Sequence, residues 1–376
     1  MKDKINLKVI FQTFCFIMMF LLLKEAYAEH FFQKHNTWYE TIPANPIIAK
    51  DSANYVNDIL INSNRLYVTY NEWSMPIWQA DSNTPITTIE MLSPDKICGS
   101  NAIANGWNKV PIPSNAKSAG MDELCQGKSR DGHMIILSHD GKWEWDFYRA
   151  RNCGDGWKAS CIRKRARTIA ASEEGIGLGD GSGILPVFQV FPNTYSQDDV
   201  MGMPRACGVS AHSQGLITYN DYQKGFIDHA IQFGYNSEKK HTGYFRDYPC
   251  LYYGGGTCER EHAMFFGSRL QLNPSYNCNQ HSNSLTKMIC EALKKYGAIF
   301  VINTGPSYNS LYLESTYGKS NFWSGIIENP LPIPINQLKV IEPVCSDCSI
   351  CPNCTVQKPV EKPEVAPAAP TIIEIK

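Results

Sequence analysis

The chain has 376 residues, and its 35 lysine and arginine side chains nearly balance its 36 aspartate and glutamate side chains. A near-neutral chain lacks the strongly basic footprint of nucleic-acid-binding proteins, so we expect no nucleic-acid partner. The one basic run, Arg163-Lys164-Arg165 with Arg167 close behind, is typical of a solvated strand end or loop.

The N-terminus has the pattern of a secretory signal peptide. Lys2, Lys4 and Lys8 precede an apolar stretch over 9–23, and Ala26-Tyr27-Ala28 is a small-x-small cleavage motif. We expect cleavage after Ala28; an uncleaved anchor is the alternative, although the stretch is shorter than the roughly 20 residues of a spanning helix. The mature chain is then expected to have no transmembrane segment, and to be secreted, periplasmic or at the cell surface.

Residues 29–340 are expected to form one β-sandwich domain, and residues 341–376 a flexible tail rich in Cys and Pro. Short alternating apolar runs with Gly, Pro and Asn between them favour an all-β fold, a sandwich or jelly roll, over an α/β fold. One helix is predicted over 284–296, with an apolar stripe, Ser282 or Ser284 as its cap and Gly297 just past its end.

A hairpin is predicted over 133–148, where Asp140-Gly141 is typical of a two-residue type I′ turn. This turn sets the register, so that Leu137 faces Glu144, Ile135 faces Asp146 and His133 faces Tyr148 on one side of the sheet. Carboxylates among apolar side chains are costly to bury without partners, so we expect this face to line a groove.

Glu144 and Asp146 are candidate catalytic carboxylates. They project the same way with Cα atoms about 7 Å apart, which suits the carboxyl separations of glycosidases, about 5–5.5 Å for retention and 6.5–9.5 Å for inversion. The alternative is a solvated or arginine-paired face, since charged residues are usually exposed.

A second candidate set suits a polysaccharide lyase. Such an enzyme needs an arginine and an amide to neutralise a uronate, and a histidine or tyrosine to move the neighbouring proton. Tyr148, His229, Arg269 and Gln271 would supply these groups, with His229 on a strand over 225–233. The alternative is a hydrogen-bonded core histidine and an ion-paired arginine.

Two further residues are expected to contact the substrate, and several motifs are not expected to carry a function. His133 and Trp145 join Arg269 and Gln271 as candidate substrate-binding residues, because aromatic rings stack on sugars. A Ser/His hydrolase is not expected at Ala211–Gly215, which lacks a G-x-S-x-G elbow. The glycine-rich stretch 175–183 lacks the Lys-Ser/Thr of a phosphate loop, and no CxxCH occurs, so we expect no cofactor and no metal.

Thirteen of the 14 cysteines follow residue 28, and in an exported chain most should form disulfides. Their spacing suggests local pairs: Cys153 with Cys161, Cys250 with Cys258, Cys278 with Cys290, and Cys98 with Cys125, with Cys207 left over. In the tail, Cys345, Cys348, Cys351 and Cys354 are expected to form disulfides within the tail or to another chain, rather than a metal site.

Four segments resemble a family of uncharacterised exported bacterial proteins: Asp131-Gly-His with Trp143-Glu-Trp-Asp-Phe-Tyr-Arg-Ala, the Ile227-Asp-His-Ala segment, Gly267-Ser-Arg-Leu-Gln-Leu-Asn-Pro, and Ala292-Leu-Lys-Lys-Tyr-Gly-Ala. The resemblance covers about residues 95–315 and implies a bacterial exported origin and a jelly roll. It implies no particular activity, and the Cys-rich tail departs from the family pattern.

The sequence therefore predicts an exported protein that binds, and in one version cleaves, a polysaccharide. The paired carboxylates predict hydrolysis, whereas the His/Tyr/Arg/Gln set predicts elimination. The alternative is a non-catalytic envelope or surface component that is attached through its tail. Convergence of the six polar side chains on one groove would favour an enzyme or a sugar-binding protein, whereas their scatter to solvent or into separate ion pairs would favour the structural component.

Overall fold

The computed structural model describes residues 31–33, 36–95, 97–179, 181, 210–236, 243–245, 248–250, 264, 267–305 and 308–341. The predicted signal peptide, the tail with its four cysteines, and Cys207 and Cys258 lie outside the described residues. Among the described residues, no helix combines the length and the apolar character that crossing a membrane requires.

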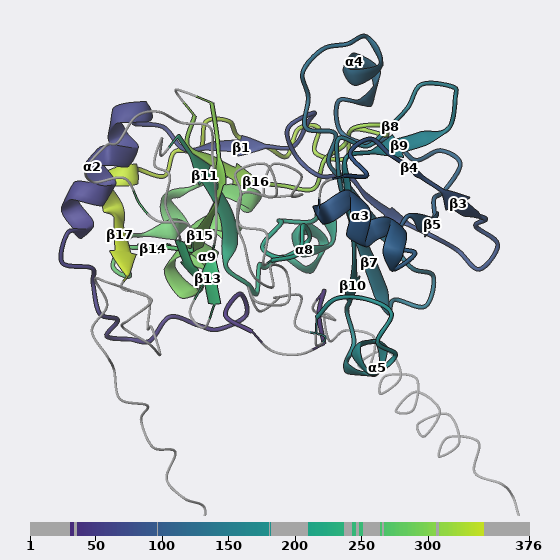
Figure 1. Ribbon diagram of the computed structural model, residues 1–376. Coiled ribbons are helices and arrows are strands. Elements are labelled where there is room, and N and C mark those ends of the chain that lie inside the picture. Colours follow the sequence, from purple (N-terminus) through teal and green to yellow (C-terminus); the bar gives the residue numbers. More distant parts are fainter. Residues whose placement is uncertain are drawn as a thin grey trace, which may run out of the picture.

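Six strands form the larger sheet, on the left of Figure 1, in the spatial order β1–β16–β11–β15–β14–β17. The strands are β1 (Tyr67–Thr69), β11 (Ile231–Tyr235), β14 (Arg269–Leu272), β15 (Ala298–Asn303), β16 (Ser310–Tyr312) and β17 (Leu338–Ile341). The pairs β1/β16 and β11/β15 are parallel, and the other three are antiparallel. The first four residues of β15 are all buried, as expected of a strand that is covered on both faces.

Two helices pack on this sheet, α9 (Ser284–Lys295) near β14 and α2 (Ser52–Asn62) near β17. The predicted C-terminal helix is thus present, although the Asn283 side chain caps it, by accepting a hydrogen bond from the backbone N–H of Thr286. Gly297 follows with a φ of 76°, and a Cβ there would collide with the Leu270 carbonyl.

The second sheet, on the right of Figure 1, has four strands in the order β10–β7–β6–β2. The strands are β2 (Ile77–Gln79), β6 (Met134–Leu137), β7 (Trp143–Tyr148) and β10 (Cys161–Ala166). The β6/β7 register agrees with the prediction, with Ile135 opposite Asp146 and Leu137 opposite Glu144. The connection is longer than a two-residue turn, because β6 ends at Leu137 and the backbone N–H of Gly141 donates to the Ser138 carbonyl at 3.0 Å. The last backbone hydrogen bond between the strands runs from the Ser138 N–H to the Trp143 carbonyl.

Short strands and helices surround the second sheet. The strands are β3 (Ile86–Thr88), β4 (Glu90–Met91), β5 (Lys109–Pro111), β8 (Arg151–Asn152) and β9 (Trp157–Ala159), with the β12/β13 pair (Gly243–Phe245, Tyr248–Cys250) elsewhere. The helices are α3 (Ile97–Ala104), α4 (Met121–Cys125), α5 (Ile169–Glu173) and α8 (Tyr219–Lys224), besides the 3-10 turns Cys278–Gln280 and Ile335–Gln337. The prediction of a single helix was therefore wrong.

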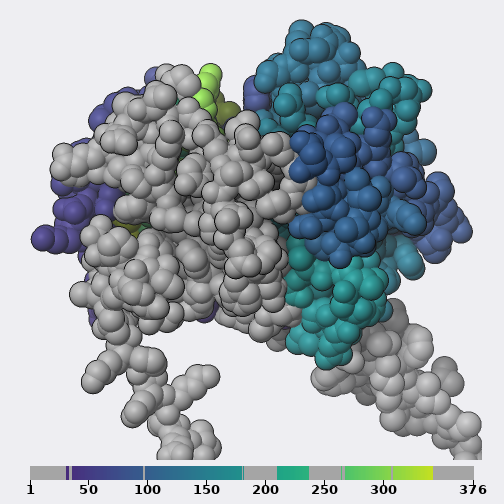
Figure 2. Space-filling model, viewed as in Figure 1, coloured from purple at the N-terminus to yellow at the C-terminus, as the bar shows by residue number. Residues whose placement is uncertain are grey.

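The fold is rich in β-strands, as predicted. The finer assignment to a sandwich or jelly roll gains no support, because both larger sheets contain parallel pairs, whereas jelly rolls are built from antiparallel strands. Each larger sheet has its own apolar core, and a third cluster lies between the two. In that cluster Ile135 and Leu137 of β6 pack with Leu216 and Tyr312, so this face of the hairpin is turned toward the six-stranded half. Figure 2 shows the surface atoms of the second half, coloured blue to teal, grouped on the right.

Three disulfides are present among the described residues, and two of the four predicted pairs were wrong. Cys278 pairs with Cys290 as predicted. Cys98 pairs with Cys161 and Cys125 with Cys153, instead of Cys98 with Cys125 and Cys153 with Cys161. The reason is spatial, since α3 packs on β10 and α4 packs on β8. Cys258 lies outside the described residues, so the Cys250–Cys258 pair stays a prediction.

Candidate functional site

The carboxylates of Glu144 and Asp146 lie inside the molecule, where they face the six-stranded half. Both residues have no exposed surface. Burial of two carboxyl groups is tolerated only when hydrogen bonds and opposite charges replace water. Their partners come from the neighbouring strand β10 and from the loop 210–214.

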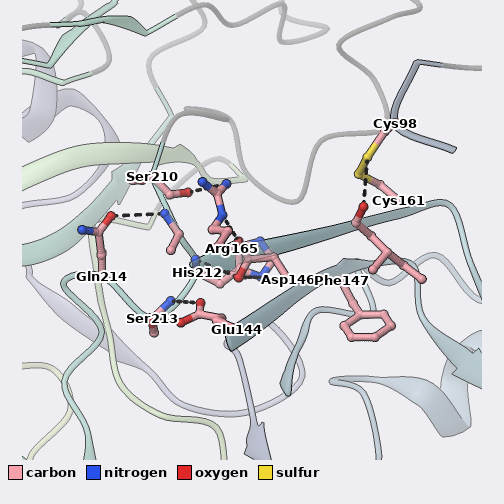
Figure 3. A network of polar contacts seen from close by, with 12 residues as sticks. Cys98, Glu144, Asp146, Phe147, Cys161, Arg165, Ser210, His212, Ser213 and Gln214 are labelled. Atoms are coloured by element: carbon pink, nitrogen blue, oxygen red, sulfur yellow. Dashed lines mark hydrogen bonds and ion pairs between the residues drawn. A yellow bond between two sulfur atoms is a disulfide. The ribbon is translucent and has the colours of Figure 1, made fainter. Parts of the chain in front are cut away.

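Asp146 lies between an arginine and a histidine (Figure 3). One carboxylate oxygen, Oδ2, accepts a hydrogen bond from Nε of Arg165 at 2.5 Å. The other oxygen, Oδ1, accepts a hydrogen bond from the backbone N–H of His212 at 3.1 Å and lies 3.8 Å from Nδ1 of the same ring. Asp146 therefore holds the backbone of His212 by a hydrogen bond, and its charge lies close to the His212 ring.

Glu144 is held by Ser213, the residue after His212. The Ser213 hydroxyl donates to Oε2 of Glu144 at 2.5 Å, and the Ser213 backbone N–H donates to Oε1 at 3.2 Å. Arg165 also donates from Nη2 to the Ser210 carbonyl at 3.2 Å. Strand residues and loop residues thus form one continuous polar network, which Figure 3 shows.

Two glutamines stabilise the loop, Gln214 from within it and Gln232 from the larger sheet. The Gln214 side chain accepts a hydrogen bond from the backbone N–H of Ala211 at 3.2 Å. On β11, the Gln232 amide donates to the carbonyl of His212 at 2.8 Å and also to that of Gln214. Because Gln232 belongs to the larger sheet, the loop connects the two halves of the molecule.

The two carboxyl groups titrate in opposite directions. Burial is the largest influence on Glu144, and with the neighbouring charge of Asp146 it raises the pKa well above its ordinary value. Burial also acts to raise the pKa of Asp146, but the charges of His212 and Arg165 outweigh it and lower that pKa to about 2. A proton shared by the two carboxyl groups is therefore favoured on Glu144 over Asp146.

His133 lies where this network approaches the surface. Its ring meets the His212 ring edge-on with centroids 4.9 Å apart, and the Tyr148 ring lies 5.6 Å away. The side chain of His133 is 14% exposed, against 0% for that of His212. Burial, with the charge of Asp131, raises the pKa of Tyr148, so its hydroxyl stays protonated at neutral pH.

The backbone around His133 has little freedom. The carbonyls of Asp131 and Gly132 accept hydrogen bonds from the backbone N–H groups of Arg149 and Ala150, at 2.7 and 3.0 Å. Gly132 has a φ of 56°, and a Cβ there would lie 2.9 Å from the Arg149 Cα. Arg149 itself has a φ of 52°, a left-handed conformation that is strained for this residue type and is typical of functional sites.

The other predicted lyase residues lie apart from this network. Arg269 donates hydrogen bonds to the carbonyls of Tyr296 and Glu40, and Gln271 donates to the carbonyl of Lys294. Both side chains therefore hold the end of α9 against the sheet. His229 lies before β11, which begins only at Ile231, and its Nε2 lies 3.5 Å from Asp221.

Trp145 is also apart from the network. It points to the opposite face of β7, is 5% exposed and belongs to the core of the second sheet. The structure thus brings Glu144, Asp146, His133 and Tyr148 into one region, and it places Trp145, His229, Arg269 and Gln271 elsewhere. The expectation that the six polar side chains line one groove was wrong, because the two acids are buried and the other set is divided between separate contacts.

Sequence reasoning missed Arg165, His212 and Ser213. The basic run is not a solvated strand end, because Arg163 and Arg165 are 4% and 1% exposed. The alternation of the basic residues was the signal that could have revealed this. Arg163 and Arg165 lie two residues apart on β10 and pair across the sheet with Asp146 and Glu144. The contact with His212 left no local signal, since the two segments are 66 residues apart.

This arrangement can support proton transfer. A half-buried imidazole and a protonated tyrosine lie at the rim, and a buried histidine, positioned by a carboxylate, lies behind them. Comparison with protein-family models, curated proteins and solved structures found no match for this chain.

Proposed function

We propose that the protein is an exported enzyme that cleaves a glycan by proton transfer, with His133 and Tyr148 at the reaction centre. The observation that carries the proposal is the edge-on contact of the His133 and His212 rings at 4.9 Å, next to Tyr148. Three disulfides among the described residues support an oxidising compartment, which agrees with a secreted, periplasmic or cell-surface location.

Within this proposal His133 is the general base. Its Nδ1 lies 3.4 Å from the Phe147 carbonyl, which only accepts hydrogen bonds, so in the neutral ring Nδ1 carries the proton and Nε2, which lies 3.8 Å from Oδ2 of Asp131, holds the lone pair. Tyr148 is the general acid, since its raised pKa keeps the hydroxyl protonated. His212 is a positioning residue, because its buried ring fixes the orientation of the His133 ring.

The geometry favours elimination over hydrolysis. Glu144 and Asp146 have no exposed surface, and their oxygens accept hydrogen bonds from Ser213, Arg165 and His212, so neither carboxylate is placed to attack a sugar. Elimination needs instead a base that takes the proton from the carbon next to a uronate carboxylate, an acid that protonates the leaving glycosidic oxygen, and a positive charge that neutralises the carboxylate. His133, Tyr148 and Arg149, whose charge acts on Tyr148, would provide these groups. We therefore propose a uronate-containing polysaccharide as the substrate class.

The test is incubation of the full exported chain with uronate-containing and neutral polysaccharides. Elimination yields an unsaturated product that absorbs in the ultraviolet, whereas hydrolysis yields reducing ends without this absorbance. His133→Gln and Tyr148→Phe should each lower the rate by about 100-fold or more. His139→Gln is the matched control, because His139 is exposed in the β6–β7 connection.

Absence of product with every polysaccharide would refute the proposal and leave a non-catalytic envelope component. Reducing ends without an unsaturated product would refute elimination. Full activity of His133→Gln would refute the assigned reaction centre.

A further inference from the structure

A group of three metal-ligating side chains lies outside the candidate site, between α8 and β11. Asp221, Asp228 and His229 each offer a ligand atom, and these atoms all lie within 4.8 Å of one another. Asp221 lies on α8, and Asp228 and His229 follow Gly225, which ends that helix with a φ of 80°. This return of the chain brings His229 back to Asp221.

The tautomer of His229 leaves a lone pair directed at a carboxylate. Nδ1 lies 2.8 Å from the carbonyl of Ala230, which only accepts hydrogen bonds, so Nδ1 carries the proton. In the neutral ring Nε2 is then an acceptor, and it lies 3.5 Å from Oδ2 of Asp221. Two acceptors at this distance repel each other unless a proton or a cation lies between them. Metal-binding histidines commonly donate their second N–H to a backbone carbonyl in this way.

We propose that Asp221, Asp228 and His229 bind a divalent transition-metal ion of the zinc class. One imidazole nitrogen and two carboxylate oxygens suit zinc and its neighbours better than calcium or magnesium, which prefer oxygen ligands alone. Three protein ligands leave a further coordination position open. This proposal does not depend on the glycan proposal.

The burial of these side chains and their access from solvent also suit the binding of a metal ion. His229 and Asp221 are 5% and 4% exposed, so their charges are shielded from water, whereas Asp228 is half-buried and gives a route from solvent. Thr218 holds Asp221 in place, by donating to Oδ2 from its backbone N–H at 2.8 Å and from its hydroxyl at 2.7 Å.

Two cations compete with the ion. Nζ of Lys224 lies 3.4 Å from Oδ1 of Asp221. A proton on Nε2 of His229 is the second competitor, because Nε2 lies 3.5 Å from Oδ2 of Asp221. Binding of the ion must therefore displace this proton.

The test is titration of the chelator-treated full chain with Co²⁺, whose visible absorbance reports nitrogen and oxygen ligation, followed by competition with Zn²⁺. One ion should bind per chain, with proton release, and Zn²⁺ should displace Co²⁺. Asp228→Asn should weaken binding by more than about tenfold, as even the loss of an outer-shell partner does. His229→Gln should abolish binding, and His139→Gln should leave it unchanged.

Asp228→Asn keeps the test decisive if His229→Gln fails to fold, because Asp228 is half-buried and the capping box of α8 is formed by Thr218 and Asp221. Absence of Co²⁺ binding by the wild-type chain would overturn the proposal and leave a protonated His229 paired with Asp221. A cobalt–thiolate spectrum that neither variant changes would place the ion on cysteines, and would overturn the proposal too.

Discussion

Glu144 and Asp146 project from the same face of β7, yet their pKa values move in opposite directions. Burial acts to raise the pKa of both groups, but the charges of Arg165 and His212 outweigh this effect only at Asp146. The charged form is thus favoured at Asp146, beside His212, and the protonated form at Glu144. Each member of the pair gives the free energy of unfolding a different pH dependence.

In the wild-type protein, Glu144 should lower the folding stability as the pH rises toward neutral, and Glu144→Gln should remove this effect. Because the folded-state pKa of Glu144 is raised above 4.5, its contribution to stability is fully present below that pH and declines as the pH rises. Glutamine keeps the shape and has no proton to lose. Urea unfolding across about pH 4.5 to 8 should show a flatter profile for the variant than for the wild type. Glu174→Gln, at an exposed site, is the control, and an equal change there would contradict the assignment.

Asp146 should act on stability in acid. Because its folded-state pKa lies at about 2, below the ordinary value of 3.8, its contribution is present above pH 3.8 and is lost as the pH falls toward 2. The difference corresponds to about 2 kcal/mol. Asp146→Asn should remove this part of the acid transition, as measured by urea unfolding at pH values below about 4. An unchanged acid profile in Asp146→Asn would contradict the lowered pKa.

The ion pair of Asp146 with Arg165 should be strongly coupled. Loss of one partner leaves a buried charge, so Asp146→Asn or Arg165→Met alone should cost about 3–5 kcal/mol of unfolding free energy at neutral pH. The double variant should cost less than the sum, with a coupling energy above about 1 kcal/mol in a double-mutant cycle. The exposed pair Lys142–Glu174, at 2.9 Å, is the control and should couple by less than about 1 kcal/mol. Equal coupling in both cycles would contradict the importance of burial.

Local sequence patterns were sufficient for the hairpin and for one helix. The register of β6 and β7 follows from a connection centred on Asp140-Gly141, although the connection is longer than predicted. Helix α9 follows from its apolar period and from Gly297. His229 was misplaced because the chain turns after Gly225, which ends α8 with a φ of 80°, so that β11 begins only at Ile231.

The candidate site depended on contacts between distant segments. Alternation on β10 could have paired Arg163 and Arg165 with the two acids, since complementary charges two residues apart on adjacent strands favour each other. No local rule brings His212 to Asp146, because their contact depends on how the two halves of the molecule pack. Two of the predicted disulfide pairs were wrong for the same reason, because the pairing of cysteines follows their distance in space and not their distance along the chain.

The disulfide assignment can be tested by stability and by mapping. Cys98–Cys161 closes a separation of 63 residues and Cys278–Cys290 one of 12. By chain entropy, removal of each pair by alanine substitution should cost about 4 and about 3 kcal/mol, respectively. Mass spectrometry of non-reduced peptides should find Cys98 linked to Cys161 and Cys125 linked to Cys153. Peptides that link Cys98 to Cys125 would contradict the structure.

Gly132 should be essential for the position of His133. A Cβ there would lie 2.7 Å from Cδ1 of Leu124 and 3.0 Å from the Ala150 nitrogen, besides the strain of a positive φ. Gly127 has a φ of 77°, and a Cβ added there would have nothing within 4 Å, so this residue separates the two effects. Gly127→Ala should cost about 1 kcal/mol from backbone strain alone, whereas Gly132→Ala should cost about 2 kcal/mol more. The proposed activity should also fall in Gly132→Ala alone, because displacement of His133 separates its ring from that of His212. Equal effects of the two substitutions on the free energy of unfolding would show that the packing around Gly132 is looser than the structure implies.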